Sequence, residues 1–254
     1  MQAEVVHISP GLAGKYLAKN KAIRSLSPSL VKMYAAEMMA GRWTLTHQGI
    51  ALNCDGSLRD GQHRLSAIIQ SGVTVPMLVT VGVKDEAVPN IDVGRTRTLT
   101  QVSQFFDLDV RVMPTTRFFY DPFDSKKVAN GELLATYQKH RPAIDFGLAN
   151  TKSGDKYYYH ANILAAILAR AYYHTPNHAR LALFPQVAVN GSEDIEDAAA
   201  SIFRKWFSAN PKPGGWAGVR EVYGKSQNAV HIFLNKKPIK QLRSNNEDLF
   251  PVTI

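Results

Sequence analysis

The densest cluster of reactive side chains in the sequence lies at residues 55–65, which read Asp-Gly-Ser-Leu-Arg-Asp-Gly-Gln-His-Arg-Leu. The cluster follows a strand-like run and precedes a helical pattern. The first N–H groups of a helix lack intrahelical acceptors, and with the helix dipole they favour an anion such as phosphate. Gly61 allows a ligand to approach the backbone closely, and Arg64 offers two-pronged donation to a phosphate.

Asp60 and His63 are the candidate catalytic side chains of this cluster. Asp60 can cap the helix, bind a metal or act as a base, and His63 can exchange a proton near neutral pH. The alternative is structural: Asp60 is only an N-cap, Gly61 only a turn residue, and His63 and Arg64 are solvated side chains of the first helical turn. Short glycine-containing motifs often match by chance, so the spacing alone leaves both interpretations open.

A second polar cluster, residues 91–98, follows a strand pattern and leads into a helical one. Asp92 is a candidate metal ligand or general base there, provided that the chain folds back to the first cluster. The arginines and threonines of this segment are candidates for a wall of the same pocket or a clamp on DNA phosphates. The alternative is a surface turn in which Asp92 pairs with a local arginine. The phosphate-binding candidates of the two clusters are Gly61, Gln62, Arg64, Arg95, Thr96 and Arg97.

Alternating strands and helices must position these clusters within the first hundred residues. Apolar patterning predicts strands at 4–8, 49–54 and 75–81, and helices from the pair Ser27-Pro28 to Gly41 and at 62–71. The second helix should turn Leu65, Ile68 and Ile69 inward and end at Gly72. Asp55-Gly56 marks a turn after the middle strand, and Cys54 is expected to be a buried strand residue.

Beyond residue 100 the pattern becomes helical. Helices are predicted at 99–106, 131–140, 157–174 and 217–234. Ser192 should cap another helix, with Glu193, Asp194 and Glu196 in its first turn, where the dipole favours acidic groups. The last dozen residues are expected to form a loose tail. The predicted fold is therefore α/β (α+β), with a small α/β domain at 1–105 and a mainly helical domain at 106–254.

The charge balance makes nucleic acid the first partner to test. Thirty Lys and Arg against 21 Asp and Glu give a formal net charge of +9, and a surplus of fixed positive charge attracts phosphate polyanions. DNA is the expected partner, while the alternative for each basic residue is a solvated surface; the oligomeric state stays open. The candidate nucleic-acid contacts are Arg24, Lys152, Lys156, Arg204, Lys205, Lys236 and Lys237.

Several classes of protein are excluded by what the sequence lacks. Cys54 is the only cysteine, so an intrachain disulfide and a zinc site built from cysteines are both impossible. No stretch approaches the roughly 18–20 apolar residues of a membrane span, so no membrane partner is expected. The opening residues lack a basic region followed by an apolar core, which favours a cytoplasmic location over secretion.

Residues 60–64 resemble the DGQHR signature of the ParB/sulfiredoxin-like superfamily, above all its phage and bacterial ParB-like nuclease-domain proteins. The resemblance extends over roughly residues 4–100: Ile8-Ser9-Pro10 matches the opening strand, Asn20 and Arg24 precede the Ser27 helix, and the strand from Gly49 precedes the motif. It implies a small mixed-sheet domain, a phosphate or nucleotide pocket at the motif, a helical extension, and a bacterial host cell if the chain is phage-encoded.

The resemblance specifies the reaction poorly. It implies hydrolysis of a nucleic-acid or nucleotide bond, by a nuclease, a base glycosylase or an NTPase, with a nucleoside triphosphate and Mg²⁺ as the candidate cofactor. The chain departs from ParB, whose paired arginines become His63-Arg64, and from sulfiredoxin, whose catalytic cysteine corresponds to Gln62. Two alternatives stay open: a non-enzymatic DNA-binding or regulatory phage protein, and a small-molecule phosphotransferase.

Overall fold

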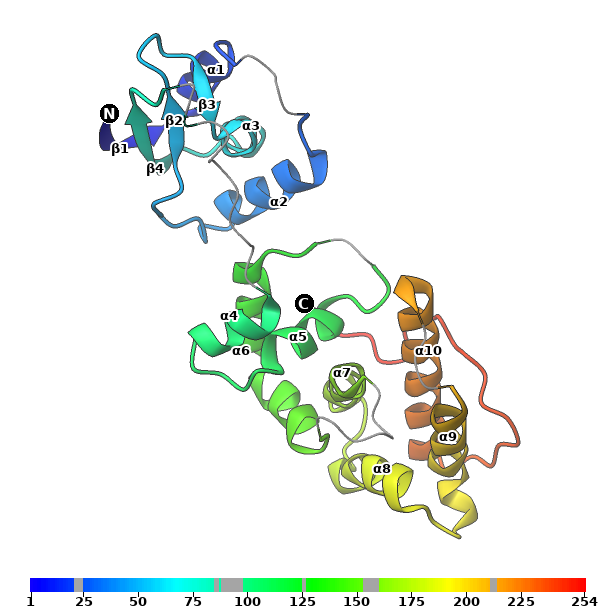
Figure 1. The fold of residues 1–254 in the computed structure, drawn as a ribbon. Coiled ribbons are helices and arrows are strands. Elements are labelled where there is room, and N and C mark those ends of the chain that lie inside the picture. The colour runs from blue at the N-terminus through cyan, green and yellow to red at the C-terminus, as the bar shows by residue number, and fades with distance from the viewer. Residues whose placement is uncertain (21–24, 85–86, 88–97, 125–126, 153–159, 211–213) are drawn as a thin grey trace. The chain divides into compact units, whose positions relative to one another are not determined.

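Figure 1 shows the computed structural model of the chain, which describes all residues except 21–24, 85–86, 88–97, 125–126, 153–159 and 211–213. The chain divides into two compact units. Unit 1 comprises Met1–Thr96 and Lys127–Glu132, and unit 2 comprises Arg97–Lys126 and Leu133–Ile254. The fold class is α+β, as the sequence predicts, with the sheet in the N-terminal part and helices in the C-terminal part.

Unit 1 contains a sheet with the strand order β1-β4-β2-β3. Its strands are β1 (Gln2–Ile8), β2 (Ile50–Leu52), β3 (Leu58–Asp60) and β4 (Val75–Val81). β4 pairs antiparallel with β1 and parallel with β2, while β2 pairs antiparallel with β3. The sheet is therefore mixed. The sequence does not predict β3, because a three-residue strand has too short a pattern and depends on pairing with β2.

Three helices accompany this sheet: α1 (Pro10–Leu17), α2 (Pro28–Met39) and α3 (Gln62–Ser71). The sequence predicts α2 and α3 but not α1, although Ser9-Pro10 carries the same start signal as Ser27-Pro28. The Ser9 hydroxyl accepts a hydrogen bond from the Leu12 N–H at 3.3 Å, which caps α1.

The core of unit 1 lies between the helices and one face of the sheet. Leu65 and Ile68 of α3 are fully buried and pack with Met77 and Val79 of β4. The prediction that Ile69 points inward is wrong, because this side chain is 45% exposed. The prediction that Cys54 is buried is also wrong: the strand ends at Leu52, and Cys54 is an exposed residue of the following turn.

Unit 2 is built from helices. They are α4 (Leu99–Phe105), α5 (Val112–Tyr120), α6 (Asn130–Ala149), α7 (Ala161–Ala171), α8 (His178–Asn190), α9 (Ala198–Ala209) and α10 (Gly215–Leu234), with the 3₁₀ turn η2 (Ile195–Asp197) before α9. Residues 163–171 of α7 are all buried, which makes this helix the centre of the unit. α6 continues past Pro142, and His140 has non-helical backbone angles at a kink that divides α6 into two helical parts, so the predicted end at residue 140 lies at this kink.

The predicted helix start at Ser192 is wrong. The Ser192 hydroxyl accepts from the Asp194 N–H at 3.1 Å in a local turn, and α9 begins six residues later. Asp197 precedes α9 and forms a 2.7 Å ion pair with Arg180 of α8. The helix starts where this buried ion pair holds the chain, which is a tertiary contact that local propensity does not encode.

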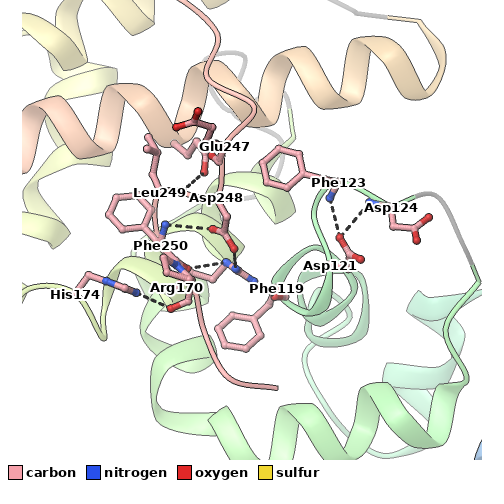
Figure 2. Close-up of polar contacts among 12 residues, drawn as sticks. Phe119, Asp121, Phe123, Asp124, Arg170, His174, Glu247, Asp248, Leu249 and Phe250 are labelled. Carbon is pink, nitrogen blue, oxygen red and sulfur yellow. Dashed lines mark hydrogen bonds and ion pairs between the residues drawn. The ribbon is translucent and has the colours of Figure 1, made fainter.

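The C-terminal residues are not the loose tail that the sequence predicts. Figure 2 shows Arg170 of α7 at their centre, paired with the Asp248 carboxylate and donating from Nε to the Phe250 carbonyl at 3.1 Å. Gln227 of α10, which is fully buried, donates to the carbonyls of Asn245 and Glu247, each at 2.7 Å. A segment without secondary structure lacks backbone hydrogen-bond partners for its carbonyl groups, and these two side chains supply donors to them.

The structure also bears on a membrane partner. Among the helices that the structure describes, none is long and apolar enough to cross a lipid bilayer.

Candidate functional site

The DGQHR residues lie where β3 passes into α3. Asp60 is the last residue of β3, and Gly61 is the N-cap of α3 with φ 105°. Asp60 is therefore not the N-cap of α3; its Oδ1 instead accepts from the Gly61 N–H at 2.6 Å. The strand-to-helix joint predicted from the sequence is present, with the carboxylate placed on the last N–H before the helix.

Gly61 is required by two features of this joint. Its φ lies in the left-handed region, which residues with a side chain rarely adopt. A Cβ at this position would also lie 2.5 Å from Ile50 Cδ1 and 3.3 Å from the Gly49 carbonyl oxygen. The missing side chain thus lets the start of α3 approach β2. Close approach to a ligand, the reason for expecting glycine here, is not needed to explain it.

Arg64 is held in place by the joint itself. Its Nη1 donates to Asp60 Oδ2 at 3.3 Å and to the Gly49 carbonyl at 3.0 Å. The side chain of Arg64 is 13% exposed and that of Asp60 is 25% exposed. Arg64 is therefore not a solvated side chain of the first turn. Both contacts use Nη1, one nitrogen of a guanidinium that carries five N–H donors. They hold the guanidinium of Arg64 at the amino end of α3.

Gln62 and His63 bind the chain that leads into α2. Gln62 Oε1 accepts from Asn20 Nδ2 at 3.1 Å, and His63 Nε2 accepts from the Ser27 N–H at 3.0 Å. Because Nε2 is an acceptor, the neutral His63 ring carries its proton on Nδ1. These two motif residues therefore hold Asn20 and Ser27, which lie on either side of residues 21–24 in the sequence, at the amino end of α3.

Three residues that contact the motif, Asn20, Ser27 and Gly49, were not among the predicted site residues. A Cβ on Gly49 would lie 1.7 Å from the Leu78 carbonyl oxygen, so only glycine fits beside β4. The signal for Asn20 and Ser27 was their place in a polar stretch before a helix. In the structure these two residues hydrogen-bond to the motif.

The remaining predicted residues fall into three groups. Those outside the described residues are Arg24, Asp92, Arg95, Thr96, Arg97 and Lys156. Lys152, Lys205 and Lys237 are exposed residues of unit 2. Arg204 and Lys236 have neighbours of their own: Arg204 Nη1 lies 3.1 Å from the Cβ position of Gly191, and Lys236 Nζ lies 2.8 Å from Glu196 Oε2.

The donor set at the motif does not suit a resident metal ion. The Asp60 carboxylate is already shared between the Gly61 N–H and Arg64. In the described part of the chain no three His, Cys, Asp or Glu side chains gather in a way that could hold a metal ion. The arrangement is suited instead to an anion, because one arginine and the start of a helix face the same place.

Comparison of the chain with protein-family models, with curated proteins and with solved structures finds no match in any of the three. The resemblance to the ParB/sulfiredoxin-like superfamily rests on the motif and its strand–turn–helix surroundings, and membership of that superfamily stays a prediction.

Proposed function

We propose that the protein binds phosphate groups at the amino end of α3 and that it is associated with DNA. The observation that carries this proposal is the placement of Arg64, which is fixed by Asp60 and the Gly49 carbonyl beside the helix start. A pre-oriented guanidinium loses little side-chain entropy when it meets a phosphate. The helix start adds N–H groups and a favourable dipole at the same place.

The contacts of the motif favour binding over hydrolysis. His63 Nε2 already accepts a hydrogen bond from the Ser27 N–H, so this nitrogen is not available as a general base while that bond persists. Both oxygens of Asp60 are already engaged, Oδ1 by the Gly61 N–H and Oδ2 by Arg64, so the carboxylate is not available as a base while these bonds persist. The non-enzymatic alternative is therefore the better supported one, with Arg64 and the α3 N–H groups as the phosphate contacts.

DNA is the proposed source of the phosphate because of the charge of the chain. The net charge is +9, and residues 201–243 contain nine Lys or Arg and one acidic residue. Such a cluster concentrates counterion release in one stretch of the molecule. A nucleotide offers the same phosphate chemistry, so it is the second ligand to test.

The test replaces Arg64 and measures phosphate binding directly. Arg64→Ala should weaken the affinity for a nucleoside triphosphate, measured by calorimetry, by about ten- to a hundredfold, because a charge-assisted hydrogen bond is lost. The matched control is Arg42→Ala in the same unit, which also breaks an ion pair, at 2.6 Å to Glu37, but lies outside the motif. Equal affinities for the wild type and Arg64→Ala, with both folded by circular dichroism, would refute the site.

A hydrolase remains the second candidate function, because Asp60 and Arg64 form a carboxylate–arginine pair that can act on a phosphate ester once a ligand displaces one partner. Release of inorganic phosphate or of cut DNA by the wild type, and its loss in Asp60→Asn, would replace the binding proposal with this one.

A further inference from the structure

A row of basic side chains follows α10. Lys237, Lys240 and Arg243 are spaced three residues apart and are all exposed. Of the residues between them, Pro238 and Gln241 are also exposed, whereas Leu242 is 6% exposed and Ile239 packs against the hydrophobic core of unit 2. The segment thus separates an apolar side, which docks on unit 2, from a charged side, which faces solvent.

This basic row is held at both ends, although the segment has no regular secondary structure. At its start the Lys237 N–H donates to the Ile232 carbonyl of α10 at 3.2 Å. At its end Asn228 Nδ2 donates to the Arg243 carbonyl at 3.0 Å, and the Asn245 N–H donates to the Gly224 carbonyl at 3.2 Å.

Gly224 allows the second of these anchors. A Cβ there would lie 2.3 Å from Ser244 Oγ and 2.7 Å from the Asn245 carbonyl oxygen. Beyond Asn245 the chain is fastened by Gln227 and by Arg170, whose contacts with Asp248 and Phe250 are drawn in Figure 2. The backbone of the row is therefore a fixed part of unit 2 and not a free tail, so the positions from which its three charged side chains extend are set before any ligand binds.

The three charges of the row have no ion-pair partner among the residues that the structure describes. None of the ion pairs in the part of the chain that the structure describes involves Lys237, Lys240 or Arg243. Lys236, immediately before the row, does form one, at 2.8 Å to Glu196. The row is thus a line of positive charge that begins one residue after a compensated lysine.

We propose that Lys237, Lys240 and Arg243 form a contact surface for the phosphodiester backbone of nucleic acid. Several cations on one fixed segment suit the successive phosphates of a nucleic acid, since each additional phosphate contact releases counterions and so increases the affinity. An anionic membrane is the less suitable partner, because the apolar residues of the segment face the core and offer nothing to insert into lipid. The inference rests on the proposed association with DNA and locates it on unit 2.

The experiment compares the wild type with the triple variant K237Q/K240Q/R243Q. Binding to a fluorescent duplex is followed by anisotropy over a series of salt concentrations. Each phosphate contact contributes about 0.9 to the slope of log K against log[salt]. The triple variant should therefore have a slope smaller by about 2–3 and bind markedly more weakly at low salt.

Arg141→Gln is the matched control, because it removes an exposed positive charge of unit 2 that is already paired, at 3.3 Å with Asp145, and that is not a candidate contact. It should leave the slope within about 0.3 of the wild type if the row alone contacts phosphates. A triple variant with the slope of the wild type overturns the inference, and so does a row that is needed for binding anionic phosphatidylserine vesicles but not for binding DNA.

The outcomes separate this inference from the proposed function. If the wild type binds DNA and the triple variant binds equally well, the row is not the contact surface and the association with DNA stands. If the wild type binds no DNA at low salt, the association with DNA fails and the row fails with it. The Arg64 experiment with a nucleoside triphosphate tests the phosphate site in both cases.

Discussion

Asp60 is a residue of the motif whose carboxylate makes its contacts within the strand-to-helix joint itself. From the sequence it is a candidate cap, metal ligand or base. In the structure its two oxygens receive the Gly61 N–H and Arg64 Nη1. A carboxylate with two donors is a good positioning group for the arginine, because it fixes the direction of the guanidinium.

This position predicts the effect of Asp60→Asn. Asparagine can still accept from the Gly61 N–H but no longer neutralises Arg64. Because Asp60 fixes the direction of the guanidinium, affinity for a nucleoside triphosphate should fall by about two- to tenfold, which is less than for Arg64→Ala because the charge of Arg64 remains. Calorimetry of both proteins measures the change. An unchanged or higher affinity would mean that the ion pair with Asp60 competes with the ligand and does not orient Arg64 for it.

His140 makes unit 2 sensitive to acid. Burial, and then the positive charge of Lys139, hold the pKa of His140 below its ordinary value. Its Nδ1 lies 3.0 Å from the Tyr173 hydroxyl, and its Nε2 is buried. A proton on this ring would therefore place a charge in the interior, next to the kink of α6.

Linkage gives the direction of the pH effect. The pKa of His140 in the folded state lies below that of the unfolded chain, about 6.5, so the unfolded chain binds more protons in this range. The free energy of unfolding should fall as the pH drops below about 6.5, by at most about 1.4 kcal/mol per pH unit from this group. Urea titrations at several pH values should show a shallower acid limb for His140→Asn; an unchanged limb would contradict the assignment.

At the scale of elements, the joint between β3 and α3 is the feature that the motif builds. A short strand, a left-handed glycine and a helix start follow one another within a few residues. Gly61 lacks room for a side chain because β2 passes close by, and Gly49, immediately before β2, lacks it because of Leu78 in β4. The amino end of α3 is therefore set by the sheet.

This geometry predicts opposite effects of two glycine substitutions. Gly61→Ala should lower the free energy of unfolding by about 1–3 kcal/mol, because alanine is strained at positive φ and its Cβ meets Ile50. Gly14→Ala, in the interior of α1 with nothing within 4 Å of the new Cβ, should raise it by about 0.5–1 kcal/mol. Chemical denaturation measures both; a harmless Gly61→Ala would contradict the joint as described.

At the scale of the whole molecule, charge separates the chain into stretches of different sign. Residues 193–197 contain four acidic side chains, whereas the stretch that follows, up to residue 243, is strongly basic. Glu196 and Asp197 are already paired, with Lys236 and Arg180. The acidic stretch thus serves internal contacts, and the surplus positive charge is left for a partner.

This surplus predicts steeply salt-dependent binding to DNA by the intact protein. If about 4–6 phosphates are contacted in all, the slope of log K against log[salt] should lie near −4 to −5. Anisotropy with unrelated duplex sequences measures it. Affinity that does not change with salt, or no affinity at low salt, would remove DNA from the proposed function.

Much of the architecture follows from local patterns in the sequence. A β-prone run predicts β1 and a largely apolar run predicts β4, while the pair Ser27-Pro28 and the glycine after Ser71 mark ends of α2 and α3. The strand–turn–helix placement of the DGQHR residues was also foreseeable. These features depend on backbone geometry within a few residues, which amino-acid type controls directly.

Only the tertiary structure decided where the polar side chains of the site and the tail go. The sequence left two interpretations of Arg64 open, as a phosphate ligand and as a solvated side chain. Its contacts are with Asp60 and with the carbonyl of Gly49, which lies fifteen positions away in the sequence. The C-terminal residues look unstructured because no local pattern orders them. They are ordered by Arg170 and Gln227, whose buried polar groups need partners that only distant chain can provide.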